Sequence, residues 1–292
     1  MNNNHTRQNE QNMICSHHQV DRRGALTIAI GIKCSDGVLL ACDSQSEFER
    51  GVDVKRLNQT KIYETGGAYL YAGSGITYQV RILVNNVGLQ IDYETRQKGS
   101  RLSKDETEST VEQVLLSLVK HYNIDRSAIL EMDDQDFFDP QVMFAGFDRD
   151  YGFYLDLLHG GGGVVEELDE SVAIGSGAAY AELLFHSLFY SGITIDEAIP
   201  IAAYIIEEVK AIDPHCGGDT RIAFLAGDTN KKGQRDIKKG SCAYFVQTDT
   251  ISQNIIRVKP SLDLIRGHCI PMILRGELDE DTIRSLTKNA KH

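Results

Sequence analysis

The first clear pattern along the chain is a pair of short apolar segments separated by a tight turn. Residues 27–42 read TIAIGIKCSDGVLLAC, with the tripeptide SDG at 35–37 between two runs of β-forming residues. Glycine accommodates the positive φ of a tight turn, so this stretch predicts a β-hairpin. A second hairpin is predicted where residues 61–63 and 68–72 flank the Gly-Gly pair at 66–67.

Two segments after the second hairpin place their apolar residues at helical spacing. Helices are therefore predicted over residues 76–90 and 110–122, with residues 96–105 as a polar connection between them. Apolar β-type patterns then return, and they predict strands at residues 142–147, 152–158 and 164–167.

From residue 171 onward the sequence again predicts helices. Residues 171–189 predict a strand, a Gly-Ser-Gly turn and a helix. Thr194 is followed three residues later by Glu197, a capping-box signature that predicts a helix start. This helix is expected to run towards residue 211 and to be distorted at Pro200. A strand is predicted at residues 221–226.

The order of these elements favours one architecture. Hairpins, two helices, strands, two helices and strands do not alternate as a parallel βαβ fold would, so two antiparallel sheets between helix layers fit better. The predicted organisation is a leader over residues 1–26, a main domain over 27–228 and a C-terminal extension over 229–292. A polar break opens the extension, and a strand pair and a helix at residues 279–289 are expected within it.

Composition narrows the function classes. The chain has 42 acidic against 30 basic residues, a net charge of −12, which argues against a nucleic-acid surface. No apolar run approaches the ~20 residues of a membrane helix. The six cysteines form no CxxC pair and the histidines complete no metal-ligand spacing. We therefore expect no metal, no cofactor and the reduced thiols of a cytoplasmic protein.

The leader allows two interpretations. Residues 1–26 are polar and rich in Asn, Gln and His, and they lack the apolar core of a secretory signal. Such a composition predicts a mobile segment. It is either a disordered tail or a propeptide that is removed before Thr27.

Several motifs, taken in order, resemble those of proteasome-type β subunits. The run TIAIGIKCSDGVLLACDSQ at residues 27–45 resembles the start of the mature family members, in which a threonine opens a strand and an aspartate ends the next one. Each further motif is weak alone, but the ordered set is specific and extends to about residue 228. The further matching pieces are Lys61-Ile62, Ala72-Gly73, Gly175-Ser176-Gly177 and DPHCGG at residues 213–218.

The resemblance implies a fold, an activity and a set of site residues. The fold is α+β, the four-layer αββα sandwich of N-terminal nucleophile hydrolases, and the activity is that of a threonine-type endopeptidase. Proteasome α subunits are disfavoured, because the leader has no helix-forming start. The implied residues are Thr27 as nucleophile, Asp43, Lys61, Ser176 and Asp213 as its catalytic support, the amide of Gly73 as oxyanion donor, and Cys216 and Gly217 as auxiliary residues.

The chemistry explains why such a site needs a free chain start. A threonine hydroxyl is a poor nucleophile at neutral pH and requires a base within hydrogen-bond reach. A terminal amine, with a pKa near ~7.7–8, suits that role. It exists only if the bond between Leu26 and Thr27 is cut, so the leader would keep the enzyme inactive. A buried Lys61 would favour loss of the hydroxyl proton, and Asp43 would balance its charge.

The chain departs from the family pattern at three positions. Leu26 stands where glycine usually precedes the threonine, which puts self-cleavage in doubt. Cys216 replaces a serine, and a thiol is a weaker hydrogen-bond partner. Tyr71 aligns with a position that lines the primary specificity pocket, so we expect a preference for small or medium P1 side chains.

Three hypotheses follow from the sequence. The first is a threonine endopeptidase that acts on unfolded polypeptides in a homo-oligomeric ring, with α-type subunits and an ATPase as further partners. The second is a structural ring subunit that keeps its leader, which Leu26 favours. The third is a peptide ligase or amidohydrolase on the same scaffold. Taken singly, each site residue also has an ordinary structural explanation as a strand start, a turn cap or a surface charge.

Overall fold

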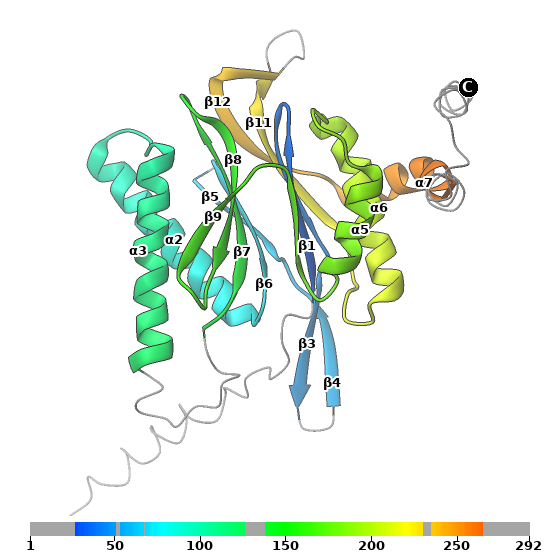
Figure 1. Cartoon of the computed structure of the whole chain (residues 1–292), viewed down its shortest axis with the longest axis horizontal. Coiled ribbons are helices and arrows are strands. Elements are labelled where there is room, and N and C mark those ends of the chain that lie inside the picture. The colour runs from blue at the N-terminus through cyan, green and yellow to red at the C-terminus, as the bar shows by residue number, and fades with distance from the viewer. Residues whose placement is uncertain (1–26, 51–52, 67, 126–137, 230–234, 265–292) are drawn as a thin grey trace, which may run out of the picture.

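The computed structural model describes residues 27–50, 53–66, 68–125, 138–229 and 235–264. Two five-stranded antiparallel sheets lie face to face at its centre, and helices cover both outer faces (Figure 1). Helices α2 (Thr77–Lys98) and α3 (Lys104–Val119) lie on one side, and α5 (Ala178–Leu188) and α6 (Ile195–Ile212) lie on the other. The predicted four-layer α+β sandwich is confirmed.

The first sheet holds the first described strand of the chain between two other strands. Its strand order is β10-β1-β2-β11-β12, and its strands are β10 (Ser171–Gly175), β1 (Ile28–Cys34), β2 (Gly37–Cys42), β11 (Arg221–Thr229) and β12 (Arg235–Phe245). β1 pairs with β10 on one side and with β2 on the other. The threonine before β1 is therefore fixed between two neighbouring strands.

The second sheet has the order β5-β6-β7-β8-β9. Its strands are β5 (Ile62–Thr65), β6 (Tyr69–Ser74), β7 (Gln141–Asp148), β8 (Gly152–His159) and β9 (Val164–Leu168). Both predicted hairpins and the three predicted middle strands are confirmed. A further hairpin, β3 (Gln45–Arg50) and β4 (Asp53–Asn58), was not predicted and projects from the sandwich (Figure 1).

Alternation along β1 explains why the sheets stack as they do. Ile28, Ile30 and Ile32 are fully buried against residues of α5 and α6, whereas Ala29 belongs to the core between the two sheets. Successive side chains of a strand point to opposite faces, so a strand that is apolar throughout must be covered on both sides. A third core fills the space between the second sheet and helices α2 and α3.

One helix start differs from the prediction. α3 begins at Lys104 because Ser103 and Glu106 form a capping box: the amide of Glu106 donates to Ser103 Oγ at 3.3 Å, and the amide of Ser103 donates to Glu106 Oε2 at 2.7 Å. The polar connection is therefore shorter than expected, residues 99–103, because α2 continues to Lys98 and the capping box starts α3 at Lys104. At Thr194 the predicted capping box is confirmed, and α6 continues through Pro200.

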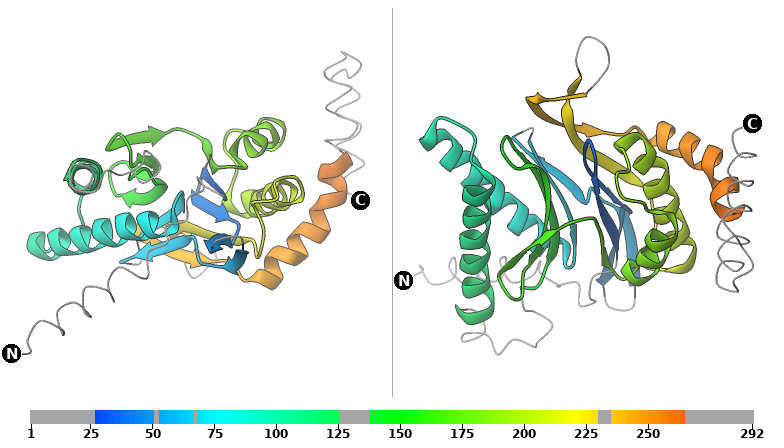
Figure 2. Two further views of the ribbon diagram at one scale, coloured as in Figure 1. Left: turned by 90° about the horizontal axis from the view of Figure 1, so that it is seen from below. Right: turned by 45° about the horizontal axis from the view of Figure 1, so that its top comes forward.

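Part of the predicted C-terminal extension packs into the sandwich. β12 pairs along β11, and α7 (Thr248–Leu264) lies outside α6 in both views of Figure 2. Ile251 of α7 is buried in the core, and Tyr204 Oη of α6 donates to Asp263 Oδ1 at 2.8 Å. The polar break expected at 228–240 is mostly strand, and the helix expected at 279–289 lies outside the described residues. Among the described helices, none combines the length and apolarity that crossing a membrane requires.

Candidate active site

Thr27 lies immediately before β1 and is 3% exposed. Its carbonyl oxygen accepts hydrogen bonds from the Ser176 hydroxyl at 3.3 Å and from the amide of Gly177 at 3.5 Å. Gly175 has a φ of +102°, and a Cβ at this position would lie 2.1 Å from the Thr27 carbonyl oxygen. The Gly-Ser-Gly turn therefore needs glycine at its start in order to hold the threonine at this place.

Asp43 follows β2 and is completely buried beside Thr27. The Thr27 hydroxyl donates to Asp43 Oδ1 at 2.5 Å, and the amide of Ile28 donates to the same oxygen at 3.2 Å. The other oxygen, Oδ2, accepts from the amides of Gly217 at 3.0 Å and Gln45 at 3.3 Å. Backbone donors from three separate segments thus fix the orientation of this carboxylate.

Lys61 supplies the positive charge of the site. It stands directly before β5 and is 7% exposed, and its ammonium lies 2.7 Å from Asp43 Oδ1. The same ammonium donates to the Thr27 hydroxyl oxygen. A buried ion pair is tolerated when each charge is compensated and hydrogen-bonded, as both are here. The hydroxyl is therefore held between a carboxylate that accepts its hydrogen bond and an ammonium that would stabilise negative charge on its oxygen.

Ser176, Asp213 and Cys216 form a second group next to the first. The Cys216 thiol donates to Asp213 Oδ2 at 3.4 Å and lies 3.8 Å from Ser176 Oγ. Burial, followed by the negative charges of Asp43 and Asp213, raises the pKa of Cys216 to about 12. The thiol therefore stays protonated at neutral pH and acts as a donor, in the manner of a hydroxyl.

The Asp213 carboxylate is kept ionised by its donors. Partial burial opposes ionisation, but hydrogen bonds from Ser176, the amide of His215 and the Cys216 thiol together hold the pKa of Asp213 below its usual value. The His215 amide contact measures 2.9 Å. Because Ser176 also contacts the Thr27 carbonyl, the structure links this carboxylate to the threonine through one side chain.

The amide of Gly73, expected to bind an oxyanion, has a partner in this structure. It donates a long hydrogen bond of 3.4 Å to the carbonyl oxygen of Lys61. A Cβ at Gly73 would lie 2.3 Å from Val80 Cγ1 of α2, so packing against the helix already demands glycine here. The oxyanion role stays a prediction.

Tyr71 is a core residue, and Leu26 lies outside the described residues. The Tyr71 ring is fully buried on the helix side of β6, 5.0 Å from the Phe144 ring between centroids. Burial is the main cause that raises the pKa of Tyr71 above its ordinary range. That this ring also limits a substrate pocket stays a prediction.

The sequence did not identify how the loop at residues 213–219 is attached. Ser44 is 1% exposed; its hydroxyl accepts from the amide of Asp219 at 2.7 Å, and its amide donates to the carbonyl of Gly217 at 3.2 Å. The only available signal was a polar pair, Ser44-Gln45, directly after a buried strand. Within the described part of the chain, no cluster of acidic, histidine or cysteine residues could hold a metal ion.

Sequence comparisons with known proteins identify the family of this chain. The family model of the proteasome subunit matches residues 25–225. The proteasome subunit beta of Halorubrum lacusprofundi is 28% identical over 213 residues, which cover 72% of this chain and 79% of that protein. The proteasome subunit beta 1 of Thermococcus gammatolerans is 23% identical, covering 73% of this chain and 93% of its own.

Alpha subunits also match. The proteasome subunit alpha of Methanococcus maripaludis strain C5 is 28% identical over 193 residues, which cover 65% of this chain and 67% of that protein. The α-type match is shorter, and the β-type relatives align over more of this chain. Since the family model covers more than half of the 292 residues, this chain belongs to the proteasome subunit family, as a member of the β type.

Proposed function

We propose that this chain is a threonine-type endopeptidase, the β-type subunit of a proteasome-like ring that acts on unfolded polypeptides in the cytoplasm. One observation supports it above all. The hydroxyl of Thr27 contacts both the carboxylate of Asp43 and the ammonium of Lys61 in a buried site at the start of β1. Such a hydroxyl is prepared for attack on a carbonyl carbon, provided that a base takes its proton.

The base in this proposal is the amine of Thr27 itself. While residues 1–26 are attached, the Thr27 nitrogen is a peptide nitrogen and cannot accept a proton. Cutting the bond between Leu26 and Thr27 would create an amine with an ordinary pKa near ~7.7–8.0, suited to proton transfer at neutral pH. Ser176, which also donates to the Thr27 carbonyl, and Asp213 would then hold the amine in position.

The reaction proceeds in two halves. The Thr27 oxygen attacks the scissile carbonyl, and its proton passes to the terminal amine. The C–N bond then breaks, the departing amine receives that proton, and an ester links Thr27 to the acyl half of the substrate. Water, deprotonated by the same terminal amine, hydrolyses the ester and restores the hydroxyl. The amide of Gly73, freed from its long bond to Lys61, would stabilise the oxyanion in both halves.

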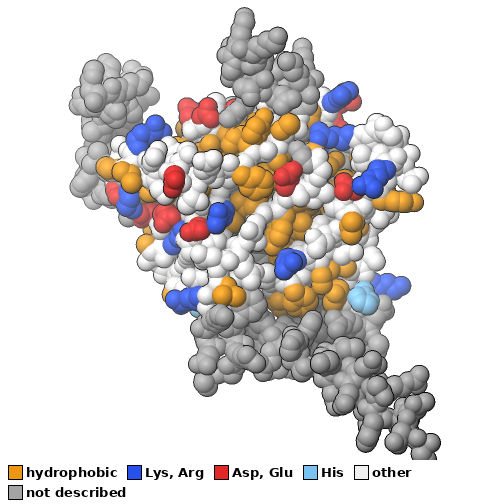
Figure 3. Space-filling model, turned by 180° about the vertical axis from the view of Figure 1, so that it is seen from behind, with side chains coloured by type: hydrophobic (Ala, Val, Ile, Leu, Met, Phe, Trp, Pro, Cys, Tyr) orange, Lys and Arg blue, Asp and Glu red, His pale blue; other side chains and the backbone are white. Residues whose placement is uncertain are grey.

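Ring assembly is the second part of the proposal. Members of this family build rings of α and β subunits, and this chain exposes large hydrophobic side chains that a partner would cover. The exposed fractions are 70% for Leu89, 58% for Tyr93 and 53% for Phe245. Hydrophobic side chains gather in the middle of the face seen from behind, with charged groups around them (Figure 3). An ATPase that delivers substrate to the ring is also part of the proposal, and only the resemblance to the family supports it.

Two measurements on protein purified from cells test the proposal. Intact mass should show loss of residues 1–26, and an epoxyketone probe, which reacts with both a hydroxyl and a free amine, should label Thr27. Thr27→Ala should keep the fold but abolish labelling and peptide hydrolysis. Hydrolysis that persists in Thr27→Ala, or in protein that keeps its full mass, would contradict the mechanism.

A structural subunit is the alternative that a specific observation favours. Leu26 replaces the glycine that usually precedes the threonine, and a bulkier residue restricts the backbone during self-cleavage. If this alternative holds, native mass spectrometry should show a ring in which every subunit keeps its leader and none reacts with the probe. A monomer that reacts with the probe would instead favour an amidohydrolase or ligase on this scaffold.

A further inference from the structure

A pocket of about 410 Å³ lies between the start of β10 and the outer face of α5, outside the candidate active site. Ser171, at its edge, pairs with Ile32 of β1, whereas Gly175, at the other end of β10, pairs with Ile28 beside Thr27. Four residues of strand place the pocket ~13 Å from the catalytic end of the sheet.

The pocket walls are held by backbone hydrogen bonds. The amide of Lys33 donates to the carbonyl of Glu170 at 2.8 Å, and the amide of Phe189 donates to the carbonyl of Phe185 at 2.8 Å. Phe185 is 4% exposed and forms part of the lining. The hollow is therefore formed without a ligand, and it is open to solvent, because Glu170, Glu182, His186 and Tyr190 in its lining are exposed.

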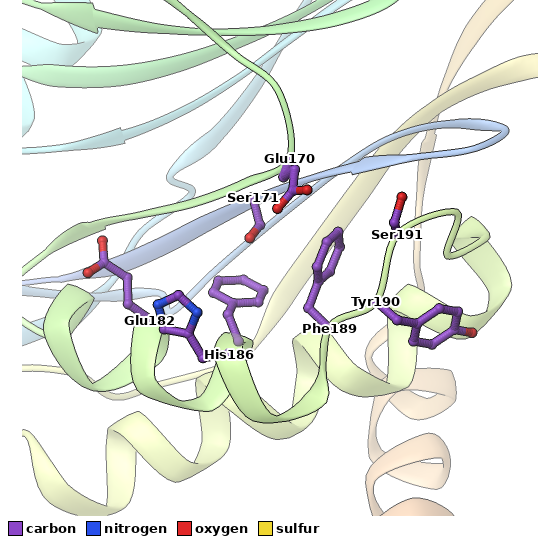
Figure 4. Close-up of a pocket in the computed structure, with 8 residues that line it drawn as sticks. Glu170, Ser171, Glu182, His186, Phe189, Tyr190 and Ser191 are labelled. Atoms are coloured by element: carbon purple, nitrogen blue, oxygen red, sulfur yellow. The ribbon is translucent and has the colours of Figure 1, made fainter.

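The lining combines carboxylates with aromatic rings. Glu170 and Ser171 belong to the strand side, Glu182 and His186 belong to α5, and Phe189 directly follows that helix (Figure 4). Tyr190, which is 49% exposed, also belongs to the lining. None of the lining residues is a lysine or an arginine, and within the described part of the chain neither Glu170 nor Glu182 has an ion-pair partner.

We propose that this pocket binds a small organic cation, a guanidinium or ammonium group carried on a short aliphatic chain. Glu170 would approach the cation from the strand side and Glu182 from α5, and the half-buried ring of Phe189 would contact the aliphatic chain. An aromatic face also attracts a cation electrostatically. The net charge of −12 also attracts a cation to the protein at longer range. The site does not depend on peptidase activity.

Two ligands of equal shape test the role of charge. Titration of the full chain with butylguanidinium at pH 8 and low salt, followed by isothermal calorimetry, should give a dissociation constant on the order of 1 mM. Butylurea, the neutral analogue, should bind at least about fivefold more weakly, and 0.3 M NaCl should weaken the cation but not the urea.

Matched variants locate the site. Glu182→Gln should weaken butylguanidinium binding about fivefold, and the double change with Glu170→Gln should abolish it. Glu112→Gln, the same loss of charge at an exposed position of α3, should leave binding unchanged. Three results would overturn the proposal. The two ligands could bind equally, Glu112→Gln could lose as much binding as Glu182→Gln, or no binding could be detected at about 10 mM, roughly ten times the expected dissociation constant.

Discussion

The buried carboxyl of Asp156 should make the folded protein less stable as the pH rises. Asp156 lies on β8 with 0% exposure, and among the described residues neither of its oxygens finds a hydrogen-bond donor. Burial is the main cause that raises the pKa of Asp156 from 3.8 to about 7, and the carboxylates of Glu108 and Glu167 add to it against the charges of Lys104 and Lys33.

The sign and size of the effect on the free energy of unfolding follow from this pKa shift. The folded state binds the proton of Asp156 more tightly than the unfolded state, so the penalty is absent below the unfolded pKa and grows until the folded pKa is passed. A rise from 3.8 to about 7 corresponds to about 4 kcal/mol at full ionisation. Of this, about 2–3 kcal/mol should develop between pH 5 and pH 8.

The assay compares Asp156→Asn with the parent chain by urea unfolding at pH 5, 6, 7 and 8, at one protein concentration. Asparagine cannot ionise, so the stability difference between variant and parent should move in favour of the variant by about 2–3 kcal/mol over this range. Any constant cost of burying the amide cancels when the difference is taken between pH values. Glu112→Gln serves as an exposed control. Parallel pH profiles for parent and Asp156→Asn would refute the reasoning.

Three further predictions concern the site. Lys61→Met leaves Asp43 as an uncompensated buried charge, so urea unfolding should show a loss of about 3–5 kcal/mol, and peptide hydrolysis should fall by about 10²–10⁴ at a temperature where circular dichroism shows folded protein. Gly175→Ala places a Cβ against the Thr27 carbonyl at a φ of +102°, so both the melting temperature and probe labelling should drop. If Tyr71 limits the pocket, peptides with alanine or valine at P1 should be cleaved faster than those with phenylalanine; the reverse order would exclude that role.

Much of the fold could be predicted because its signals are local. The apolar runs around residues 35–37 and 66–67 predict hairpins whatever surrounds them, and the Thr194–Glu197 box predicts the start of α6. Ser103 and Glu106 follow the same local rule, but the polar residues around them hide the start of α3 in the hydrophobic pattern. The hairpin β3–β4 was not predicted because its strands, QSEFER and DVKRLN, are mostly polar and show no clear apolar alternation.

The candidate active site likewise has features that the sequence predicts and features that only the folded chain shows. From the sequence, the ordered motifs predicted a site of Thr27, Asp43, Lys61, Ser176 and Asp213, and the folded chain brings these residues together. Sequence order could not determine that the amides of Gln45 and Gly217 would converge on one carboxylate oxygen. Nor could it determine that Gly73 is required by Val80, because a close approach between a strand and a helix depends on packing.

The sequence by itself determined the kind of most elements and the chemical groups available, since hydrophobic period, turn residues and capping pairs act over a few neighbouring residues. Only the tertiary structure decided which groups meet and how deeply they are buried. Burial and charge neighbours arise when segments that are separated along the sequence pack together in the folded chain. They turn Asp156 into a weak acid, keep the Cys216 thiol protonated and hold the Thr27 hydroxyl between opposite charges.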